Sequence, residues 1–398
     1  VSGLAMTLGS GAMTNPIADI TRDVDVVKCI HRDVSGGRCD SIEIELEHAA
    51  AWYRWKPQRD DVMEVQKDGY STGILFLNTI LPTAGKYRII ATSLPSTSRR
   101  KTYAVYEDMR ISDIVASCAA ECGMDSALFG IDNDITYPYL MRQKEGAPAF
   151  LSRILKYEGA VLKSLNGRLT AISIEYAQGM AATQTIKITA DQVGTYYLRR
   201  DDIKLAGITI KTPYATGGAE DADAPYGQRE LFTAHPATDS AQAARWARGL
   251  LLCHNRTAEE LTVNMEFNPG MTAMTRIDIE SATDADGQWL IDEVEHDFFR
   301  KTSKAKLLRC VKTIGEFSWT GSEAIPSITQ QSREPHRLTI RKKKTKRSKK
   351  SARKDLSKAI YAAAQTADAL STDNANACMP ACTDSNISYR RARNNYEK

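Results

Sequence analysis

The sequence predicts a β-rich α+β protein with two β-rich blocks, an α/β insertion between them and a basic C-terminal tail. Segments near residues 20–100 and 185–320 alternate in polarity with period two, as strands with one buried and one wet face do. Residues 106–184 instead contain apolar side chains at helical spacing. Residues 341–398 hold 15 Lys and Arg against 5 Asp and Glu, so this tail carries +10 and the preceding residues −6, for a net +4.

The chain of 398 residues is too long for one ordinary domain, and we divide it into four parts. We expect a first β domain over residues 1–105, an α/β insertion over 106–184, a second β domain with one helix over 185–325, and an extension over 326–398. Ten of the fourteen residues 341–354 are Lys or Arg, and their mutual repulsion opposes folding. The extension is therefore expected to be partly disordered.

The first block is predicted to form the hairpins of a sandwich or barrel. The segment Ile42–Glu47 alternates aliphatic residues with glutamates, which is the pattern of a half-buried strand. Further strands are predicted over Asp61–Gln66, Thr72–Ile80 and Lys86–Leu94, with turn chemistry at Asp68-Gly69.

The middle of the chain changes to helical periodicity. The apolar positions of Ile111–Cys122, including Cys118, have the spacing of a buried helix face, so we interpret its cysteines as core thiols rather than metal ligands. A second helix is predicted over Pro148–Glu158, followed by Gly159. Asn166-Gly167 then predicts a type I′ hairpin between strands over 160–165 and 168–176.

In the second block one helix interrupts the strands, predicted over Asp239–Leu252. Thr216–Gly227 is rich in Gly, Ala and Asp and is predicted to be an exposed loop. The predicted strands are Thr185–Thr189, Gly207–Thr212, Leu261–Phe267, Arg276–Ser281 and Gln288–Asp297.

Motifs that would indicate catalysis are missing from the sequence. It contains no H-E-x-x-H, G-x-x-x-x-G-K-[ST], G-x-G-x-x-G or G-x-S-x-G. The cluster Asp292–Asp297 has residue types that suit a metal, but strand alternation divides them between two faces, which favours a hydrated strand with a packed histidine. Glu158 together with the acids of 132–134 matches the carboxylate pair of a glycosidase in residue type only. We predict no catalytic, cofactor or metal site.

Two further features suggest contacts with partners. Trp52 and Trp55 are either a stacking platform for bases or sugars or, as we favour, packing in a barrel wall or subunit contact. No stretch approaches the roughly 20 apolar residues that span a bilayer, so no membrane contact is expected. The tail is expected to bind a partner through Arg341, Lys342, Lys343, Lys344, Lys346, Arg347, Lys349, Lys350, Arg353 and Lys354.

A family resemblance rests on the order of ten segments, which together cover roughly residues 20–315. They are Ala51–Pro57, Asp60–Gln66, Thr72–Leu77, Ile90–Ser93, Arg100–Lys101, Ile111–Gly123, Phe150–Ala160, Asn166–Leu169, Asn268–Met271 and Gly287–His296. This order resembles the phage late control D family, the baseplate hub proteins of contractile-tailed phages, which are related in plan to the base of type VI secretion spikes.

The resemblance implies that the two β blocks are tube-like β-barrels and that the protein is a homotrimeric, non-enzymatic hub. Three chains would present six barrels, matching a sixfold tail tube on one side and a threefold central spike on the other. The implied partners are the spike, the tail tube, the tape measure protein and other baseplate (wedge) proteins. The implied location is the tail baseplate of a virion, assembled in the host cytoplasm.

Structural roles for single residues follow from the same resemblance. Trp52, Trp55 and Pro57 would close the first barrel or its subunit seam, and Glu158-Gly159 would end the inserted helix. Pro269, Gly270 and Gly287 would be turn positions of the second barrel, with Trp289 in its core and His296 packed nearby.

Other functions stay open at this point. The tail is expected to bind the spike or tape measure protein; contact with DNA is a less favoured alternative, and a solvated extension without function is a third. For the whole chain the alternatives to a hub are a tail-associated cell-wall hydrolase and a nucleic-acid-binding protein that acts through the tail.

Overall fold

The computed structural model describes residues 4–9, 18–19, 25–47, 57–83, 86–132, 134–188, 196–200, 204–233 and 237–318. The chain divides into two compact units, residues 1–318 and 319–398, and all described residues belong to the first. The expected basic, partly disordered extension over 326–398 therefore lies outside the described residues.

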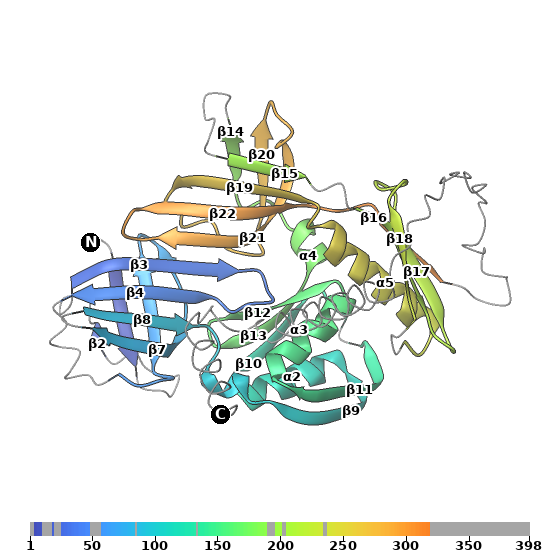
Figure 1. The fold of residues 1–398 in the computed structure, drawn as a ribbon, viewed down its shortest axis with the longest axis horizontal. Coiled ribbons are helices and arrows are strands. Elements are labelled where there is room, and N and C mark those ends of the chain that lie inside the picture. Colours follow the sequence, from blue (N-terminus) through green and yellow to red (C-terminus); the bar gives the residue numbers. More distant parts are fainter. Residues whose placement is uncertain are drawn as a thin grey trace, which may run out of the picture. The chain divides into compact units, whose positions relative to one another are not determined.

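Most strands belong to one large sheet (Figure 1). It has 14 strands, and its longest path runs β15-β19-β22-β21-β3-β4-β8-β7-β5-β1-β2. The strands are β1 (Leu4–Gly9), β2 (Ala18–Asp19), β3 (Asp25–Val34), β4 (Ser41–Glu47), β5 (Val62–Lys67), β6 (Tyr70–Ser71), β7 (Leu75–Thr83), β8 (Lys86–Thr92), β14 (Thr185–Ile188), β15 (Tyr196–Arg200), β19 (Glu259–Glu266), β20 (Arg276–Ser281), β21 (Gly287–Asp297) and β22 (Thr302–Arg309).

We call β1–β8 the first block, and β14, β15 and β19–β22 with their connecting loops the second block. They join where β3 pairs antiparallel with β21, with His31 opposite His296 and Arg32 opposite Glu295. The β-rich α+β class predicted from the sequence is confirmed. The path formed by the described strands is open, so closed barrels are not part of what these residues show.

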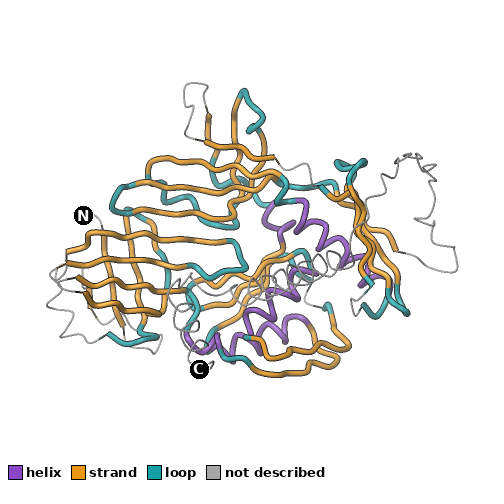
Figure 2. Tube along the Cα trace, viewed as in Figure 1, coloured by secondary structure: helices purple, strands orange, loops and turns teal. Residues whose placement is uncertain are grey.

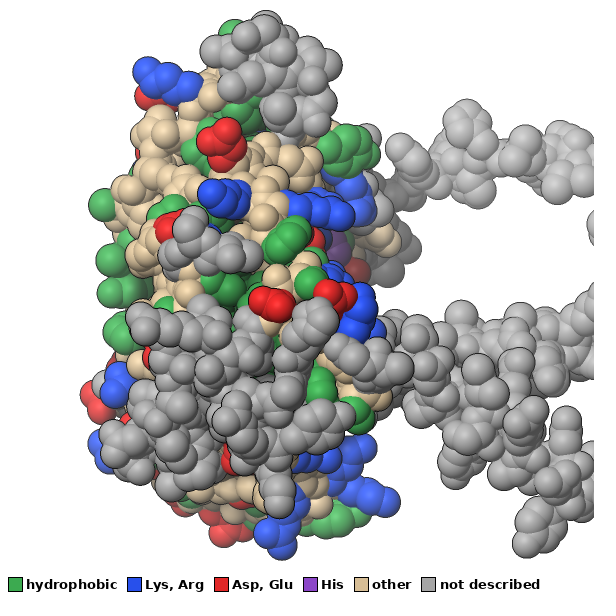
Figure 3. Space-filling view, turned by 90° about the vertical axis from the view of Figure 1, so that its left-hand side faces the viewer, with side chains coloured by type: hydrophobic (Ala, Val, Ile, Leu, Met, Phe, Trp, Pro, Cys, Tyr) green, Lys and Arg blue, Asp and Glu red, His purple; other side chains and the backbone are tan. Residues whose placement is uncertain are grey.

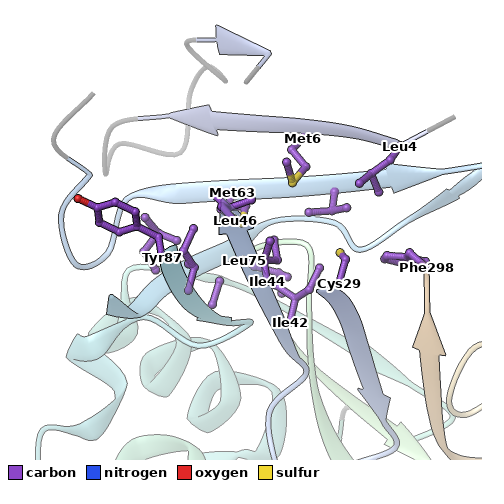
Figure 4. Close-up of a cluster of buried hydrophobic side chains, with 14 of the residues drawn as sticks. Leu4, Met6, Cys29, Ile42, Ile44, Leu46, Met63, Leu75, Tyr87 and Phe298 are labelled. Carbon is purple, nitrogen blue, oxygen red and sulfur yellow. The ribbon is translucent and has the colours of Figure 1, made fainter. Parts of the chain in front are cut away.

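Each block has its own hydrophobic core. The first core contains the inward residues of β4, namely Ile42, Ile44 and Leu46, and reaches Phe298 at the end of β21 (Figure 4). The second core surrounds Trp289. Each aliphatic side chain buried in this way contributes about 1.5–3 kcal/mol, so both blocks have an independent source of stability.

Residues 102–179, which we call the insertion, contain most of the helices (Figure 2). Helices α2 and α3 pack between a two-stranded antiparallel sheet and a three-stranded sheet of order β10-β13-β12. The elements are β9 (Thr102–Arg110), α2 (Ile111–Cys122), β10 (Asp125–Phe129), β11 (Thr136–Glu145), α3 (Ala147–Tyr157), β12 (Ala160–Leu165), β13 (Arg168–Ser173) and α4 (Ile174–Gly179), preceded by the 3-10 helix η1 (Ser96–Arg99).

Local sequence signals predicted two elements of the insertion correctly and one incorrectly at its end. The predicted helix Ile111–Cys122 is confirmed, and Gly123 ends it in the left-handed region at φ 72°. The Asn166-Gly167 hairpin is also confirmed, with both residues at positive φ. The strand predicted over 168–176 is wrong at its end, because Ser173 caps the short helix α4 through a hydrogen bond from Tyr176 N.

The last sheet, of order β18-β16-β17-β23, packs against helix α5 (Ser240–Asn255). Asp239 caps this helix by accepting from Gln242 N at 2.8 Å. Figure 3 shows a different side of the molecule, the left-hand side of Figure 1, where acidic and basic side chains are interspersed. The strands of this sheet are β16 (Leu205–Lys211), β17 (Thr216–Asp221), β18 (Gln228–Phe232) and β23 (Ile314–Ser318).

The exposed loop predicted over Thr216–Gly227 is wrong for Thr216–Asp221, whereas residues 222–227 form turns that are mostly exposed. Thr216–Asp221 forms β17, and its small residues are buried under α5. A Cβ atom on Gly217 would lie 2.3 Å from Ala244 N. Glycine is therefore needed here for close approach of the helix, not for an exposed turn.

A second close approach joins α5 to the end of α3 and generates a stability prediction. A Cβ on Gly249 would lie 2.1 Å from Tyr157 O and 2.4 Å from Gly159 N. Because these neighbours are backbone atoms, we expect Gly249→Ala to lower the free energy of unfolding by about 3 kcal/mol. Urea titration followed by circular dichroism measures it.

Gly179→Ala is the matched control for this substitution, since a Cβ there meets nothing within 4 Å. It should change stability by less than about 0.5 kcal/mol. Equal midpoints for the two variants would show that the α3–α5 contact is not as close as described.

Candidate functional site

The site that links the parts of the chain is a buried ion cluster. The Lys163 ammonium, on β12 of the insertion, contacts the carboxylates of Asp33 and Asp40, with 3.3 Å between Nζ and Asp40 Oδ2. It also donates to the Val34 carbonyl at 2.9 Å. The backbone N–H of Ala273, from the second block, donates to Asp33 Oδ2 at 2.8 Å. One cluster thus holds together the insertion and both β blocks.

Local geometry aims the two carboxylates at the lysine. Asp33 lies on the inward side of β3, two residues after His31, because successive strand residues alternate in direction. Asp40 follows the turn after β3 and accepts from Val34 N at 2.9 Å, while its own N–H donates to Ser93 Oγ at 3.0 Å. These hydrogen bonds hold Asp40 in place within the first block.

Burial and charge pairing shift the pKa values of the three cluster residues in opposite directions. Burial disfavours the charge of Asp33, but the Lys163 contact outweighs it and holds the pKa of Asp33 below its usual value. Burial also raises the pKa of Asp40 to about 7, despite the attraction of Lys163. Burial would lower the pKa of Lys163, yet the two carboxylates raise it above its usual value. The core of the cluster is therefore a charged Lys163–Asp33 pair, and Asp40 changes protonation near neutrality.

Two histidines lie beside this cluster, opposite one another across β3 and β21. Both are buried, and burial lowers the pKa of each; for His31 the pKa is about 3. His296 is hydrogen-bonded at both ring nitrogens, to Ser303 Oγ at 2.9 Å and to the Met271 carbonyl at 3.0 Å. The Tyr70 hydroxyl is hydrogen-bonded to His31 Nδ1 at 3.0 Å. Both rings are neutral packing groups at the junction.

The second polar cluster surrounds Glu158, which follows α3. Its carboxylate is 2% exposed and accepts from Arg245 Nε at 2.7 Å, from Trp246 Nε1 at 2.8 Å and from the Tyr137 hydroxyl. A cavity of about 200 Å³ adjoins it. Because the carboxylate accepts from three side chains and is paired with Arg245, it connects the insertion with α5. Gly159 follows at φ +62° and allows the approach of Gly249.

The residues predicted for the second block lie at its loops and core. Gly270 N donates to Asn268 Oδ1 at 3.0 Å in the turn that contains Pro269. Gly287 opens β21 at φ +122°. Trp289 is fully buried, donates from Nε1 to the Ala285 carbonyl at 2.8 Å and lies under the Arg309 guanidinium, 4.3 Å from its ring centroid.

The other predicted residues are Pro57 and several that the structure does not describe. Pro57 begins a described segment and is half-buried. Trp52 and Trp55 lie outside the described residues, and so do the basic side chains of the tail, Arg341 to Lys354. Among the residues that the structure covers, no group of three or more His, Cys, Asp or Glu side chains is arranged to hold a metal. In that same part of the chain no helix is long and apolar enough to cross a membrane.

Sequence reasoning did not find Lys163, Asp33 or Asp40. Lys163 lies in β12, where Leu162 and Ser164 are buried as well, so no alternation marks it. A signal was present on β3, because period-two spacing puts Asp33 on the same side as Cys29 and therefore inside. A carboxylate predicted to face a core implies a buried cationic partner.

The ion cluster generates a stability prediction. Lys163→Met leaves Asp33 and Asp40 buried without their cation, so we expect it to lower the free energy of unfolding by about 3–5 kcal/mol. Lys187→Met is the control, because its pair with Glu280 is exposed and should contribute less than about 1 kcal/mol. Chemical denaturation at neutral pH measures both. Similar losses for the two variants would contradict a buried cluster.

His31 generates a prediction about pH. In the unfolded chain it takes up a proton as the pH falls below its ordinary pKa of 6.5, whereas in the folded chain it stays neutral until about pH 3. The folded state therefore loses stability as the pH falls through this window, by up to about 1.4 kcal/mol per pH unit for one proton.

The raised pKa of Asp40 works in the opposite direction below about pH 7, so the informative quantity is a difference between proteins. His31→Gln should make the slope of unfolding free energy against pH less positive than in wild type, by up to about 1.4 kcal/mol per pH unit between about pH 6 and about pH 4. Urea titrations of both proteins at several pH values test this. Parallel curves would show that His31 titrates normally.

Comparison with known proteins shows which solved structures have a similar fold. No protein-family model matches the sequence, and no curated protein matches it. Solved structures do match. The tail protein from Neisseria meningitidis MC58 has a TM-score of 0.59 at 11% identity, covering 77% of this chain and 97% of that one. The 43 kDa tail protein of prophage MuSo2 from Shewanella oneidensis has a TM-score of 0.59 at 12% identity, covering 77% and 98%.

Prophage tail protein gp18 from Listeria monocytogenes EGD-e is similar as well, with a TM-score of 0.53 at 12% identity over 77% of this chain and 95% of that chain. These proteins match nearly along their whole length, so the likeness extends over a complete architecture and not one common sheet. This chain shares the fold of these tail proteins, so the resemblance predicted from its sequence is confirmed at the level of the fold.

Proposed function

We propose that this protein is the structural baseplate hub of a contractile phage tail, a homotrimer that adapts the sixfold tail tube to the threefold central spike. The observation that carries the proposal is the pairing of β3 with β21, which joins two blocks with separate cores into one sheet. Two such units in each chain allow a ring of three chains to present six units. The shared fold with phage tail proteins supports this reading.

In the assembled ring each block is proposed to complete a tube-like barrel. The open path of the described strands leaves edges at both ends of the large sheet, and unpaired edges favour pairing with another chain. Permanent contacts of this kind bury roughly 2,000 Å² or more. The proposed partners are the central spike, the tail tube, the tape measure protein and wedge proteins, in a virion baseplate assembled in the host cytoplasm.

The hub acts through its interfaces in this proposal and not through catalysis. The two polar clusters of the described residues support it, because their charged groups are buried and engaged with one another. Hydrolase activity would need an acid whose carboxyl group is available to substrate, whereas Glu158 is 2% exposed and already accepts from Tyr137, Arg245 and Trp246. The tail, for which partner docking is proposed, lies outside the described residues.

Stoichiometry tests the proposed function. Co-expression of the full chain with the spike protein of the same phage should yield a complex with three copies of this chain, measured by light scattering and native mass spectrometry. Electron micrographs should show six lobes at the end that meets the tail tube. The chain alone is the control, since a free monomer that becomes three copies with the spike is compatible with a hub. Two or six copies in the complex would end the proposal.

A further inference from the structure

The buried ion cluster brings an amine and two carboxyl groups into contact away from solvent. Lys163 Nζ contacts Asp33 Oδ1, and these side chains are 5% and 6% exposed. The Asp40 side chain, 4% exposed, contacts the same nitrogen, with its Oδ2 at 3.3 Å. An amine, a carboxyl group for it to attack and a second carboxyl group that can carry protons are the three parts that amide formation requires.

The backbone holds Lys163 in this position from both sides. Ser164 Oγ donates to the Ser93 carbonyl of the first block at 2.8 Å. Before the lysine, a Cβ on Gly36 would lie 3.1 Å from the Leu162 carbonyl oxygen, so the turn after β3 packs closely against β12 (Figure 1). Because β12 is fixed on both sides of the lysine, the amine and the carboxyl group stay in contact, which lowers the barrier to a reaction between them.

The surroundings of the pair also fit an amide. Asp33 Oδ2 accepts from the Ala273 N–H at 2.8 Å, and Lys163 Nζ donates to the Val34 carbonyl at 2.9 Å. If the nitrogen were joined to Asp33 Cγ, the amide oxygen would keep the first of these hydrogen bonds and the amide N–H the second. The Ala273 N–H also faces the oxygen that becomes negative when an amine attacks the carboxyl carbon.

Burial favours the amide over the ion pair. In water, hydration stabilises an ammonium and a carboxylate, so the two do not condense. In this cluster both charges are removed from water, and that removal costs free energy. An amide has no net charge, and here its oxygen and its N–H would both be hydrogen-bonded, so its burial costs little.

We propose that Lys163 and Asp33 join in an isopeptide bond, with Asp40 as the catalytic residue that moves the protons. Asp40 carries one proton from the ammonium to Asp33 Oδ1, which leaves a neutral amine beside a carboxylic acid. The nitrogen lone pair attacks Cγ and forms the C–N bond. Asp40 then carries a second proton from the nitrogen to the Oδ1 hydroxyl, the C–Oδ1 bond breaks, and one water leaves. The third proton stays on the amide nitrogen, and Asp40 ends as it began.

The position of Asp40 suits this role. Val34 N donates to its Oδ1 at 2.9 Å, and its Oδ2 is the oxygen nearer to the amine. Burial raises the pKa of Asp40 to about 7, so near neutral pH its carboxyl group both accepts and releases a proton readily. The reaction takes place once in each chain, so it does not need to be fast.

The bond would tie the insertion to the first block by a covalent link between residues that are 130 positions apart. An ion pair separates when a load pulls the two strands apart, whereas an amide holds. The bond does not depend on the proposed role as a hub, since it requires only the folded chain. In the proposed hub it would keep the insertion attached to the β blocks under mechanical load.

Intact mass spectrometry of the purified, denatured full chain tests the bond. The wild type should be lighter than its sequence mass by about 18 Da, the mass of one water. Lys163→Arg keeps the positive charge but does not lose its proton, so it should have its full sequence mass. Lys187→Met, which changes an exposed pair with Glu280, is the control and should show the same loss as the wild type. A wild type of full mass would overturn the proposal.

Tryptic digestion of the wild type locates the bond and does not depend on the folding of a variant. Trypsin does not cleave after an acylated lysine, so residues 33–38 should be joined to residues 157–168 in one branched product. A linear peptide that ends at Lys163, a branch to Asp40 within residues 39–54, or a loss of water inside a single linear peptide would each contradict the assignment.

Asp40→Asn tests the catalytic role, because an amide of the same shape cannot take up the proton. The rate of bond formation, followed by mass in newly synthesised chains, should fall by about 100-fold or more. Asp40→Glu keeps a carboxyl group and should restore the bond. If Asp40→Asn has the circular dichroism of the wild type and joins as fast, the role of Asp40 is wrong. If it does not fold, the mass and the peptide map of the wild type still decide whether the bond exists.

Discussion

The architecture of residues 4–318 depends on one buried cation. A lysine ammonium removed from water is costly unless carboxylates replace its hydration, and here Asp33 and Asp40 do so from the first block. Asp33 is at the same time held by a backbone N–H of the second block. Because any slip of the insertion by one residue would leave three charged groups without partners, the cluster specifies how insertion and β blocks meet. Apolar packing alone would tolerate several such arrangements.

The seam between β3 and β21 makes the two blocks one continuous sheet. Its inner side is lined by His31 and His296, whose rings are neutral and buried, and its outer side by the Arg32–Glu295 pair. A backbone ladder is much stiffer than a flexible linker between domains. The proposed role as an adapter between two symmetries needs this stiffness, since an error in the angle between the two units of a chain would be repeated in every copy around the proposed ring.

Sequence patterns predicted elements whose cause is local. β4 alternates glutamate with aliphatic residues because one face is wet, and Asn166-Gly167 adopts positive φ because that turn requires it. β17 was missed because Gly217 is small for the sake of a helix that follows it by more than twenty residues. The ion cluster was missed for the same reason: Lys163 and Asp33 are 130 residues apart, and only the fold brings them into contact.

The close backbone contact between Gly249 of α5 and Gly159 after α3 has a consequence for exchanging parts between related proteins. A chimera that transplants residues 102–179 alone would set a foreign surface against α5, where there is no space for even one methyl group. Successful recombination would have to carry α5 along with the segment it touches, although more than sixty residues separate them in the chain. A recombination breakpoint between the insertion and α5 would therefore separate two segments whose backbones must fit together.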